Sequence, residues 1–310
     1  CDPRMQILYD AADDEEYRQI ASALRKGIKP QNLPPQHPAK AYRNVWHNLA
    51  VQDEGEDSLI LLEGTRIVVP PRARSEILRL LHIPHAGIVK TRRAAQEYYF
   101  WPGINNDIKL ITEACPACRT LLPSQTAEPL LQTQTSGPMQ NVSTDLFSIE
   151  GQDWIVMADR FSGYPWIKRL SSTSSSAIIN TLKSWFCDFG FPTNIRSDGG
   201  PQFRSEFEEW CKSNGIRHEL SSPYHPESNG HAEAAVKQMK LLIKKCRASN
   251  EDLDMALFEW RNCPRADGHS PAAMMFGRRQ RGHLPNIAPG NIDPEAAANA
   301  RKQTLDAAKT

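Results

Sequence analysis

Two pairs of metal-ligating side chains stand close together in the first half of this 310-residue sequence. His82 and His85 are separated by two residues, and Cys115 and Cys118 form a Cys-x-x-Cys pair. Zn²⁺ is satisfied by four nitrogen and sulfur ligands in a tetrahedron, and a closed site of this kind is structural. The segment over 73–119, which holds all four side chains, is too short to bury much core. A bound zinc ion would therefore supply folding energy. The alternative is a chance His pair beside a redox Cys-x-x-Cys, but a redox motif is expected after a strand and this one follows predicted helices.

Three carboxylates in the second half could hold divalent metal ions: Asp145, Asp198 and Glu233. Asp145 interrupts a strand-like run, where an acid is costly unless it faces a partner or an ion. Asp198 follows a short predicted strand and precedes Gly199-Gly200, at the kind of strand end where α/β sheets expose functional groups. Glu233 lies in the first turns of a long predicted helix. Carboxylate oxygens suit Mg²⁺ or Mn²⁺, and two such ions can activate a nucleophile and stabilise a leaving oxygen during phosphodiester attack.

Spacing alone does not single out these acids among the 36 in the chain. Asp159, Glu219 and Glu227 compete with them, and any single acid could instead be a solvated carboxylate or an ion-pair partner. Asp159 stands at the end of a predicted strand beside a basic residue, and Glu227 lies in a predicted loop where its orientation is less fixed.

The predicted helix that carries Glu233 also carries lysines on the same face. Glu233, Lys237 and Lys240 lie at i, i+4 and i+7. One interpretation is a metal-holding carboxylate beside lysines that bind phosphates. The other is an ion pair on a solvated helix face, worth about 0.2–0.5 kcal/mol. The residues alone leave both open.

The elements that would position these side chains fall into two groups on either side of a proline-containing polar segment over 121–138. Apolar periodicity before that segment predicts helices over 1–29, 73–82, 91–100 and 105–114, and a hairpin over 59–69 that turns on Glu63-Gly64. After the segment it predicts strands over 140–149, 154–159, 164–170, 193–196 and 216–220, with helices over 177–189, 205–213, 228–247 and 253–263. Three meandering strands followed by alternating helices and strands indicate a mixed α/β sheet with helices packed on it.

Composition and charge narrow the class of protein. Seven cysteines with one close pair favour a reducing, intracellular setting. The sequence has no apolar run of eighteen residues, so no membrane partner is expected. It begins with neither a Met nor a secretory signal, which suggests a segment of a longer polyprotein. The formal net charge is +1, yet 234–247 holds five basic residues and no acid. Such a local basic stripe is compatible with a DNA-binding surface.

Several motifs, in this order along the chain, resemble the integrases of Ty3/gypsy-type LTR retrotransposons, which are relatives of retroviral integrases. The zinc-binding part is similar in Leu81-His82-x2-His85-Ala86-Gly87-Ile88, in Tyr99-Phe100-Trp101-Pro102-Gly103 and in Cys115-x2-Cys118. The catalytic part is similar in Ser197-Asp198-Gly199-Gly200-Pro201-Gln202-Phe203, in Ser222-Pro223-Tyr224-His225-Pro226-Glu227-Ser228-Asn229-Gly230-His231-Ala232-Glu233, in Trp260-Arg261-Asn262-Cys263-Pro264 and around Ser270-Pro271. The resemblance covers about 57–285.

The resemblance implies an α/β, RNase H-like catalytic core with a mixed five-stranded sheet, preceded by a small helical zinc-binding domain. The expected divisions are an N-terminal helical extension and linker over 1–56, the zinc-binding domain over 57–122, a linker over 123–138, the core over 139–285 and a tail over 286–310. No counterpart of the family's C-terminal module is expected after 285.

The resemblance also implies a role for each matched residue. Asp145, Asp198 and Glu233 would be the catalytic acids and would bind Mg²⁺ or Mn²⁺, while His82, His85, Cys115 and Cys118 would bind structural Zn²⁺. Asn229, Lys237, Lys240 and Lys244 would bind DNA. Glu233 is preferred over Glu227 because Gly230-x-x-Glu233 matches the family's approach to the helix, although the gap after Asp198 is one residue shorter than is usual in retroviral enzymes.

The implied function is DNA integration. The enzyme would process the 3′ ends of element DNA and then transfer them into target DNA, with double-stranded DNA as partner and a homo-oligomer joining the ends. A nuclear location follows from the substrate alone. Alternatives are a catalytically silent, domesticated DNA-binding descendant, a zinc-dependent protein-interaction module, and a nuclease of the same fold that only hydrolyses.

Overall fold

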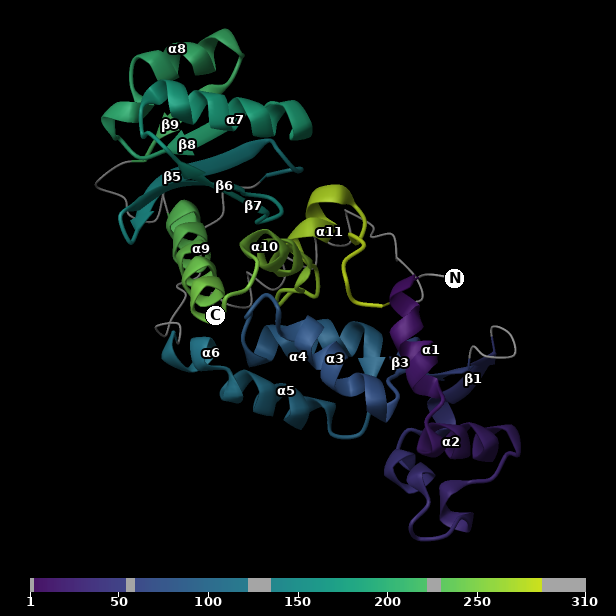
Figure 1. Cartoon of the computed structure of the whole chain (residues 1–310). Helices are drawn as coiled ribbons and strands as arrows, with labels where there is room; N and C mark the ends of the chain where they lie inside the picture. The colour runs from purple at the N-terminus through teal and green to yellow at the C-terminus, as the bar shows by residue number, and fades with distance from the viewer. Residues whose placement is uncertain (1–2, 54–58, 122–134, 222–229, 286–310) are drawn as a thin grey trace, which may run out of the picture. The chain divides into compact units, whose positions relative to one another are not determined.

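A computed structural model describes residues 3–53, 59–121, 135–221 and 230–285 (Figure 1). The chain divides into two compact units. The first draws on 1–120, 254–264 and 280–290, and the second on 121–253, 265–279 and 291–310. Neither unit is one continuous segment, because the chain returns to the first unit after completing most of the second.

The first unit contains a four-stranded sheet in the order β1-β2-β3-β4. β1, β2 and β3 pair antiparallel, and β4 joins β3 in parallel. The predicted hairpin is confirmed, and Gly64 in its turn has φ +59°, a conformation that glycine adopts at no steric cost. The strands are β1(Leu49–Asp53), β2(Leu59–Glu63), β3(Arg66–Val68) and β4(Tyr99–Phe100).

The first unit also contains α-helices and short 3-10 helices. The α-helices are α1(Gln6–Ala12), α2(Glu15–Arg25), α3(Arg74–His82), α4(Ile88–Tyr98), α5(Ile104–Ala114), α6(Pro116–Thr120) and α10(Leu253–Asn262), the last from Asp254 onward. Of these, α1, α2 and α4 contact the sheet. The 3-10 helices are η1(Pro3–Met5), η2(Pro30–Asn32), η3(Pro38–Tyr42), η4(Trp46–Asn48) and η5(Pro71–Ala73). The sequence predicted one helix over 1–29, and this prediction was wrong: Asp14 is extended and its side chain accepts a hydrogen bond from the Tyr17 N–H at 3.2 Å, so α2 starts anew at an N-cap.

The N-terminal helices share a core with the helices that follow the sheet. Leu8 is fully buried in the same cluster as Ile77 and Trp101. The Tyr17 hydroxyl donates to the Val68 carbonyl at 2.8 Å and accepts from the Leu61 N–H at 2.7 Å. β1 and β2 pair across the predicted domain boundary at residue 56. A segment this small buries too little surface alone, so its core is completed by the preceding chain.

The second unit is built on the predicted mixed five-stranded sheet, which is confirmed. The strand order is β7-β6-β5-β8-β9. The first three strands in sequence pair antiparallel, and β8 and β9 extend the sheet in parallel. The strands are β5(Asn141–Ile149), β6(Gln152–Asp159), β7(Pro165–Leu170), β8(Asn194–Ser197) and β9(Arg217–Leu220).

Helices cover both faces of this sheet (Figure 1). α7(Ser175–Phe189) and α8(Glu206–Ser213) pack on one face, where Ile155 and Ile178 belong to one buried cluster. α9(Gly230–Ser249) packs on β5 and β6 on the other face. η6(Pro201–Phe203) and α11(Pro271–Phe276) complete the unit.

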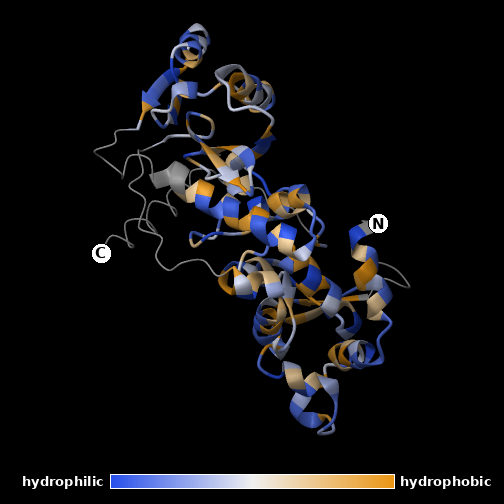
Figure 2. Cartoon of the chain, turned by 60° about the vertical axis from the view of Figure 1, so that its left-hand side comes forward, coloured by the Kyte–Doolittle hydropathy of each residue, from blue (hydrophilic) through white to orange (hydrophobic). Residues whose placement is uncertain are grey.

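Helices mix hydrophobic and hydrophilic positions along their length (Figure 2), as expected for helices with one face on a sheet and the other in water. In α9 the buried positions include Val236, Met239 and Ile243, which recur at helical spacing, while Lys237 and Lys244 are exposed. Within the described residues, we find no helix with the length and apolar character needed to cross a membrane.

Candidate metal centres

The four predicted zinc ligands come together in the first unit at the junction of three helices. His82 is the last residue of α3, and His85 lies in the turn that follows. Cys115 is the C-cap of α5, and Cys118 lies in α6. Their ligand atoms all lie within 4.8 Å of one another. The turn after α3 and the end of α5, represented by His85 and Cys115, are 30 residues apart in sequence and meet at this site.

The spacing of these atoms fits a tetrahedral zinc ion. His85 Nδ1 lies 3.4 Å from Cys118 Sγ and 3.7 Å from Cys115 Sγ, and His82 Nε2 lies 3.7 Å from Cys118 Sγ. With zinc–sulfur bonds of about 2.3 Å and zinc–nitrogen bonds of about 2.0–2.1 Å, a tetrahedron separates sulfur from nitrogen by roughly 3.5 Å. The donor set and its geometry both suit Zn²⁺, and burial of His85 and Cys118 keeps the site closed.

A strained turn aims His85 at the cysteines. Its backbone has φ +44°, a left-handed conformation that is uncommon for a residue with a side chain. The His85 N–H donates to the His82 carbonyl at 2.8 Å, which closes the turn directly after α3. Gly87, at φ +83°, then starts α4. The turn thus places the two imidazole rings 4.7 Å apart at an interplanar angle of 78°.

In the second unit, Asp145 and Asp198 are positioned by two strands that pair in parallel. Asp145 is within β5, and Asp198 directly follows β8. The β5–β8 register pairs Asn141 with Asn194 and Ser143 with Arg196. The parallel pairing ends at Ser143 and Arg196, so Asp145 and Asp198 each follow the paired segment by two residues. Both acids are half-buried, which is compatible with two carboxylates that share an ion.

Hydrogen bonds hold the end of β8 in place. The Gly200 N–H donates to Asp198 Oδ1 at 3.1 Å. Ser197 is fully buried, and its hydroxyl lies 2.8 Å from His218 Nε2 on β9. The Ser221 hydroxyl donates to the Ser197 carbonyl at 2.7 Å. Burial lowers the pKa of His218, which favours the neutral ring in this network.

The competing acids on the sheet have structural partners. Asp159 is completely buried and accepts hydrogen bonds from the Met139 N–H, the Ser162 N–H and the Ser162 hydroxyl at 3.0, 2.7 and 2.5 Å. Glu219 on β9 forms an ion pair with Arg196 on β8 at 2.7 Å. Glu227 lies outside the described residues.

Glu233 occupies the first turn of α9, although its side chain lies outside the described part of the structure, as does the whole of Asn229. Further along this helix, the Lys240 ammonium lies 5.4 Å from the centre of the Phe147 ring. Phe147 is two residues after Asp145 and therefore projects from the same face of β5. Asp145 thus belongs to the face of the sheet that α9 covers.

Sequence reasoning missed two supports of this region, the Phe147–Lys240 contact and the Ser197–His218 pair. Phe147 could have been found from its alternation with Asp145 along the strand. His218 gave no local signal, because its partner comes from a different strand.

Residues 69–123 match the integrase zinc-binding domain family, and residues 135–226 match the integrase core domain family. The first match includes all four candidate zinc ligands. The second includes Asp145 and Asp198 and ends before Glu233.

The chain is also similar to parts of longer proteins. The chain is 31% identical over 238 residues to an uncharacterized protein of Caenorhabditis elegans, covering 74% of this chain and 19% of that protein. It is 29% identical over 192 residues to the Pro-Pol polyprotein of feline foamy virus, covering 59% of this chain and 16% of the polyprotein. The chain therefore spans about a fifth or less of the length of these relatives. Among solved structures, that of the simian T-cell lymphotropic virus intasome with a PP2A regulatory subunit matches at 23% identity and a TM-score of 0.44, over 69% of this chain and 79% of that chain.

Proposed function

We propose that this chain, which carries an integrase zinc-binding domain and an integrase core domain, is a metal-dependent polynucleotidyl transferase that integrates DNA. In the first step, water would attack a phosphodiester near the 3′ end of the element DNA, and the 3′ oxygen would leave with a proton. In the second step, the freed 3′ hydroxyl would attack a phosphodiester of the target, and a new 3′ oxygen would leave. Both steps are in-line displacements governed by positioning and charge neutralisation.

One observation supports the proposal: Asp145 and Asp198 each come two residues after the last parallel pair of β5 and β8. The backbone hydrogen bonds that pair β5 with β8 would hold the two carboxylates near each other before any ion binds. We assign Asp145, Asp198 and Glu233 as ligands of Mg²⁺ or Mn²⁺. These hard cations prefer oxygen ligands, and when bound they would polarise the phosphate and lower the pKa of the attacking hydroxyl group.

Lysines lie on α9, the helix that also carries Glu233. Lys237 and Lys244 are exposed, and Lys240 is held against Phe147. Their spacing of three and four residues places all three on one side of the helix. We assign them, with Asn229, to contacts with double-stranded DNA, and the zinc ion to the folding of the first unit. A homo-oligomer is proposed because two DNA ends must be joined together. A retrotransposon of the Ty3/gypsy type is proposed as the source from the sequence motifs, and a nuclear location from the substrate.

The test is a joining assay with the full chain, a short duplex that carries an element end, plasmid DNA, and Mg²⁺ or Mn²⁺. The unmodified protein should transfer the duplex into the plasmid. Asp198→Asn should lower joining by at least about 100-fold, because charge stabilisation in the transition state is lost, while binding of the duplex stays within about twofold.

Asp188→Asn is the matched control, because Asp188 is an exposed acid on α7, which covers the opposite face of the sheet. This control should join DNA at the unmodified rate. Full joining by Asp198→Asn would refute the catalytic assignment. Binding without joining in the unmodified protein would favour the domesticated DNA-binding descendant instead.

A further inference from the structure

Asp198 stands at the point where the sheet stops holding the chain. It directly follows β8, whose last paired residue is Ser197, opposite Leu220 on β9. Gly199 and Gly200 come next, and glycine restricts the backbone less than any other residue. The orientation of the Asp198 backbone therefore depends on hydrogen bonds that side chains make to it.

Two consecutive hydrogen bonds connect Asp198 to β9. The Ser197 hydroxyl donates to the Asp198 carbonyl oxygen at 2.9 Å. The same hydroxyl oxygen lies 2.8 Å from Nε2 of His218. A hydroxyl group has a single proton to donate and lone pairs with which to accept. Because the Ser197 proton is directed to Asp198, the Ser197 oxygen accepts from the His218 ring, which carries its proton on Nε2.

The surroundings of Ser197 and His218 hold this connection in place. Ser197 is completely buried, so water does not reach its hydroxyl. The Ser221 hydroxyl and N–H both donate to the Ser197 carbonyl, at 2.7 and 2.9 Å. The His218 ring stands edge-on to Phe207, with centroids 5.0 Å apart and planes at 74°. Phe207 is itself completely buried, so the imidazole is held at a fixed angle to Ser197.

His218 lies on the face of the sheet that α8 covers. Phe207, which its ring contacts, belongs to α8 and to the buried cluster on that face. Asp145 belongs to the opposite face, where Phe147 meets Lys240 of α9. The imidazole therefore acts on Asp198 through Ser197 and the main chain, from the side of the sheet away from Asp145.

We propose that His218 is a positioning residue for the Asp198 carboxylate, acting through the Ser197 hydroxyl and the Asp198 carbonyl. The inference rests on the proposed function, in which Asp198 is a ligand of Mg²⁺ or Mn²⁺. Without this connection, the Asp198 backbone turns more freely beside the glycine pair, and fewer molecules hold the carboxylate in the orientation that binds the ion. Replacement of residues that orient metal ligands typically lowers metal affinity or activity by about 10–100-fold.

The test uses the full chain in two measurements: amide hydrogen exchange without metal, and Mn²⁺ binding without DNA, followed by the electron paramagnetic resonance of free Mn²⁺. The Gly200 N–H donates to Asp198 Oδ1 at 3.1 Å and therefore reports on the carboxylate. His218→Leu and Ser197→Ala should each speed Gly200 exchange by at least about fivefold. Each should weaken Mn²⁺ binding by at least about tenfold.

Two further variants separate positioning from general packing. His218→Gln should keep both measurements within about twofold of the unmodified protein, because the glutamine amide can donate to Ser197 as Nε2 does. The double variant Ser197→Ala/His218→Leu should lose no more Mn²⁺ affinity than either single variant, because both changes break one connection.

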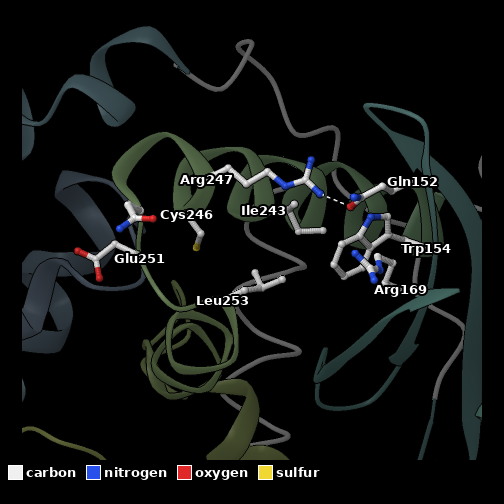
Figure 3. Close-up of a pocket in the computed structure, with 9 residues that line it drawn as sticks. Gln152, Trp154, Arg169, Ile243, Cys246, Arg247, Glu251 and Leu253 are labelled. Carbon is white, nitrogen blue, oxygen red and sulfur yellow. Dashed lines mark hydrogen bonds between the residues drawn. The ribbon is translucent and has the colours of Figure 1, made fainter.

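Gln152→Leu is the matched control for His218→Leu. Gln152 of β6 accepts a hydrogen bond from Arg247 of α9 at 2.5 Å (Figure 3), so this variant also loses a side-chain bond to the sheet. Thr181→Val is the control for Ser197→Ala, because the buried Thr181 hydroxyl donates to a carbonyl within α7 at 3.0 Å. Both controls should keep Gly200 exchange and Mn²⁺ binding within about twofold, because distant, unconnected sites act independently.

Thermal unfolding shows that each variant is folded at the assay temperature. The proposal is overturned if Gly200 exchange or Mn²⁺ binding is unchanged in both His218→Leu and Ser197→Ala. It is also overturned if His218→Gln loses as much Mn²⁺ affinity as His218→Leu, because the ring would then serve packing alone. Weakened Mn²⁺ binding in the two variants, with no joining by the unmodified protein, would refute the proposed function and still support the positioning role.

Discussion

Asp159 and Asp198 lie in different surroundings, which determine whether the carboxylate stabilises the fold or remains available to bind an ion. Asp159 is completely enclosed and accepts three hydrogen bonds, so its negative charge holds the turn between β6 and β7. Asp198 is half-buried, and among the described residues its side chain accepts one hydrogen bond, from Gly200. A carboxylate with so few donors retains lone pairs for an ion.

Asp159→Asn should therefore lower the free energy of unfolding by about 3 kcal/mol, because an amide presents an N–H₂ group to donors that need an acceptor, and because half-buried Arg265 loses a nearby opposite charge. Urea unfolding followed by circular dichroism measures this change. Asp198→Asn should cost less than about 1 kcal/mol in the same experiment. Equal losses of unfolding free energy in Asp159→Asn and Asp198→Asn would contradict the separate roles of these two aspartates.

His218 should make stability depend on pH. Burial lowers its pKa in the folded protein, so the folded state resists a proton that the unfolded chain takes up below about pH 6.5. The stability that this group contributes is complete above the unfolded pKa and is lost as pH falls from there toward the folded pKa. His218→Gln should flatten the decline in unfolding free energy between about pH 7 and pH 5. The exposed His47→Gln control should keep the slope of the unmodified protein.

At the scale of elements, the zinc site joins the end of α3 to the junction of α5 and α6. The purified chain should contain about one zinc ion, measured by atomic emission, and Cys115→Ser should lose it and unfold the first unit. Cys187→Ser is the control, because Cys187 is exposed on α7 and belongs to no ligand cluster within the described part of the chain. Retention of zinc in Cys115→Ser would show that the ligands are wrongly assigned.

Long elements with clear periodicity could be predicted from the sequence. The five strands of the second unit and the helices α3, α5, α7, α8, α9 and α10 lie within a few residues of their predicted positions. β4 could not be predicted, because it has two residues and exists through its pairing with β3. The break between α1 and α2 was missed, because Asp13-Asp14 lies within an otherwise helical pattern.

The candidate sites were predictable to different degrees. Ligand types and close spacing identified the His82 and Cys115 pairs directly, since local geometry suffices for each pair. The acids were different: Asp145 and Asp198 are 53 positions apart, and what brings them together is the pairing of β5 with β8. Non-local pairing leaves no mark in local spacing, so the residues alone could not exclude Asp159 or Glu219.

At the scale of the whole molecule, a formal net charge of +1 conceals an uneven distribution. Binding of the full chain to a DNA duplex should weaken with salt, because each neutralised phosphate releases counterions. The double variant Lys237→Gln/Lys244→Gln should reduce the slope of log K against log salt concentration by about 2. Fluorescence anisotropy across a salt series measures this slope.

Lys212→Gln provides the control for this experiment. Lys212 is exposed on α8, which packs on the opposite face of the sheet from α9. Its loss should leave the slope unchanged. A salt slope that is the same in the double variant and the unmodified protein would place the DNA on another surface.

The parallel pairing of β5 with β8 also determines which changes in chain length the protein tolerates. Between these strands the chain makes two strands and a helix, and the turns there can gain or lose residues without moving either aspartate. A single residue inserted between Asn141 and Asp145 is different, because it turns the acid to the opposite face of the sheet. Insertions and deletions should therefore accumulate in homologous chains over the connecting turns, while both paired segments keep constant length.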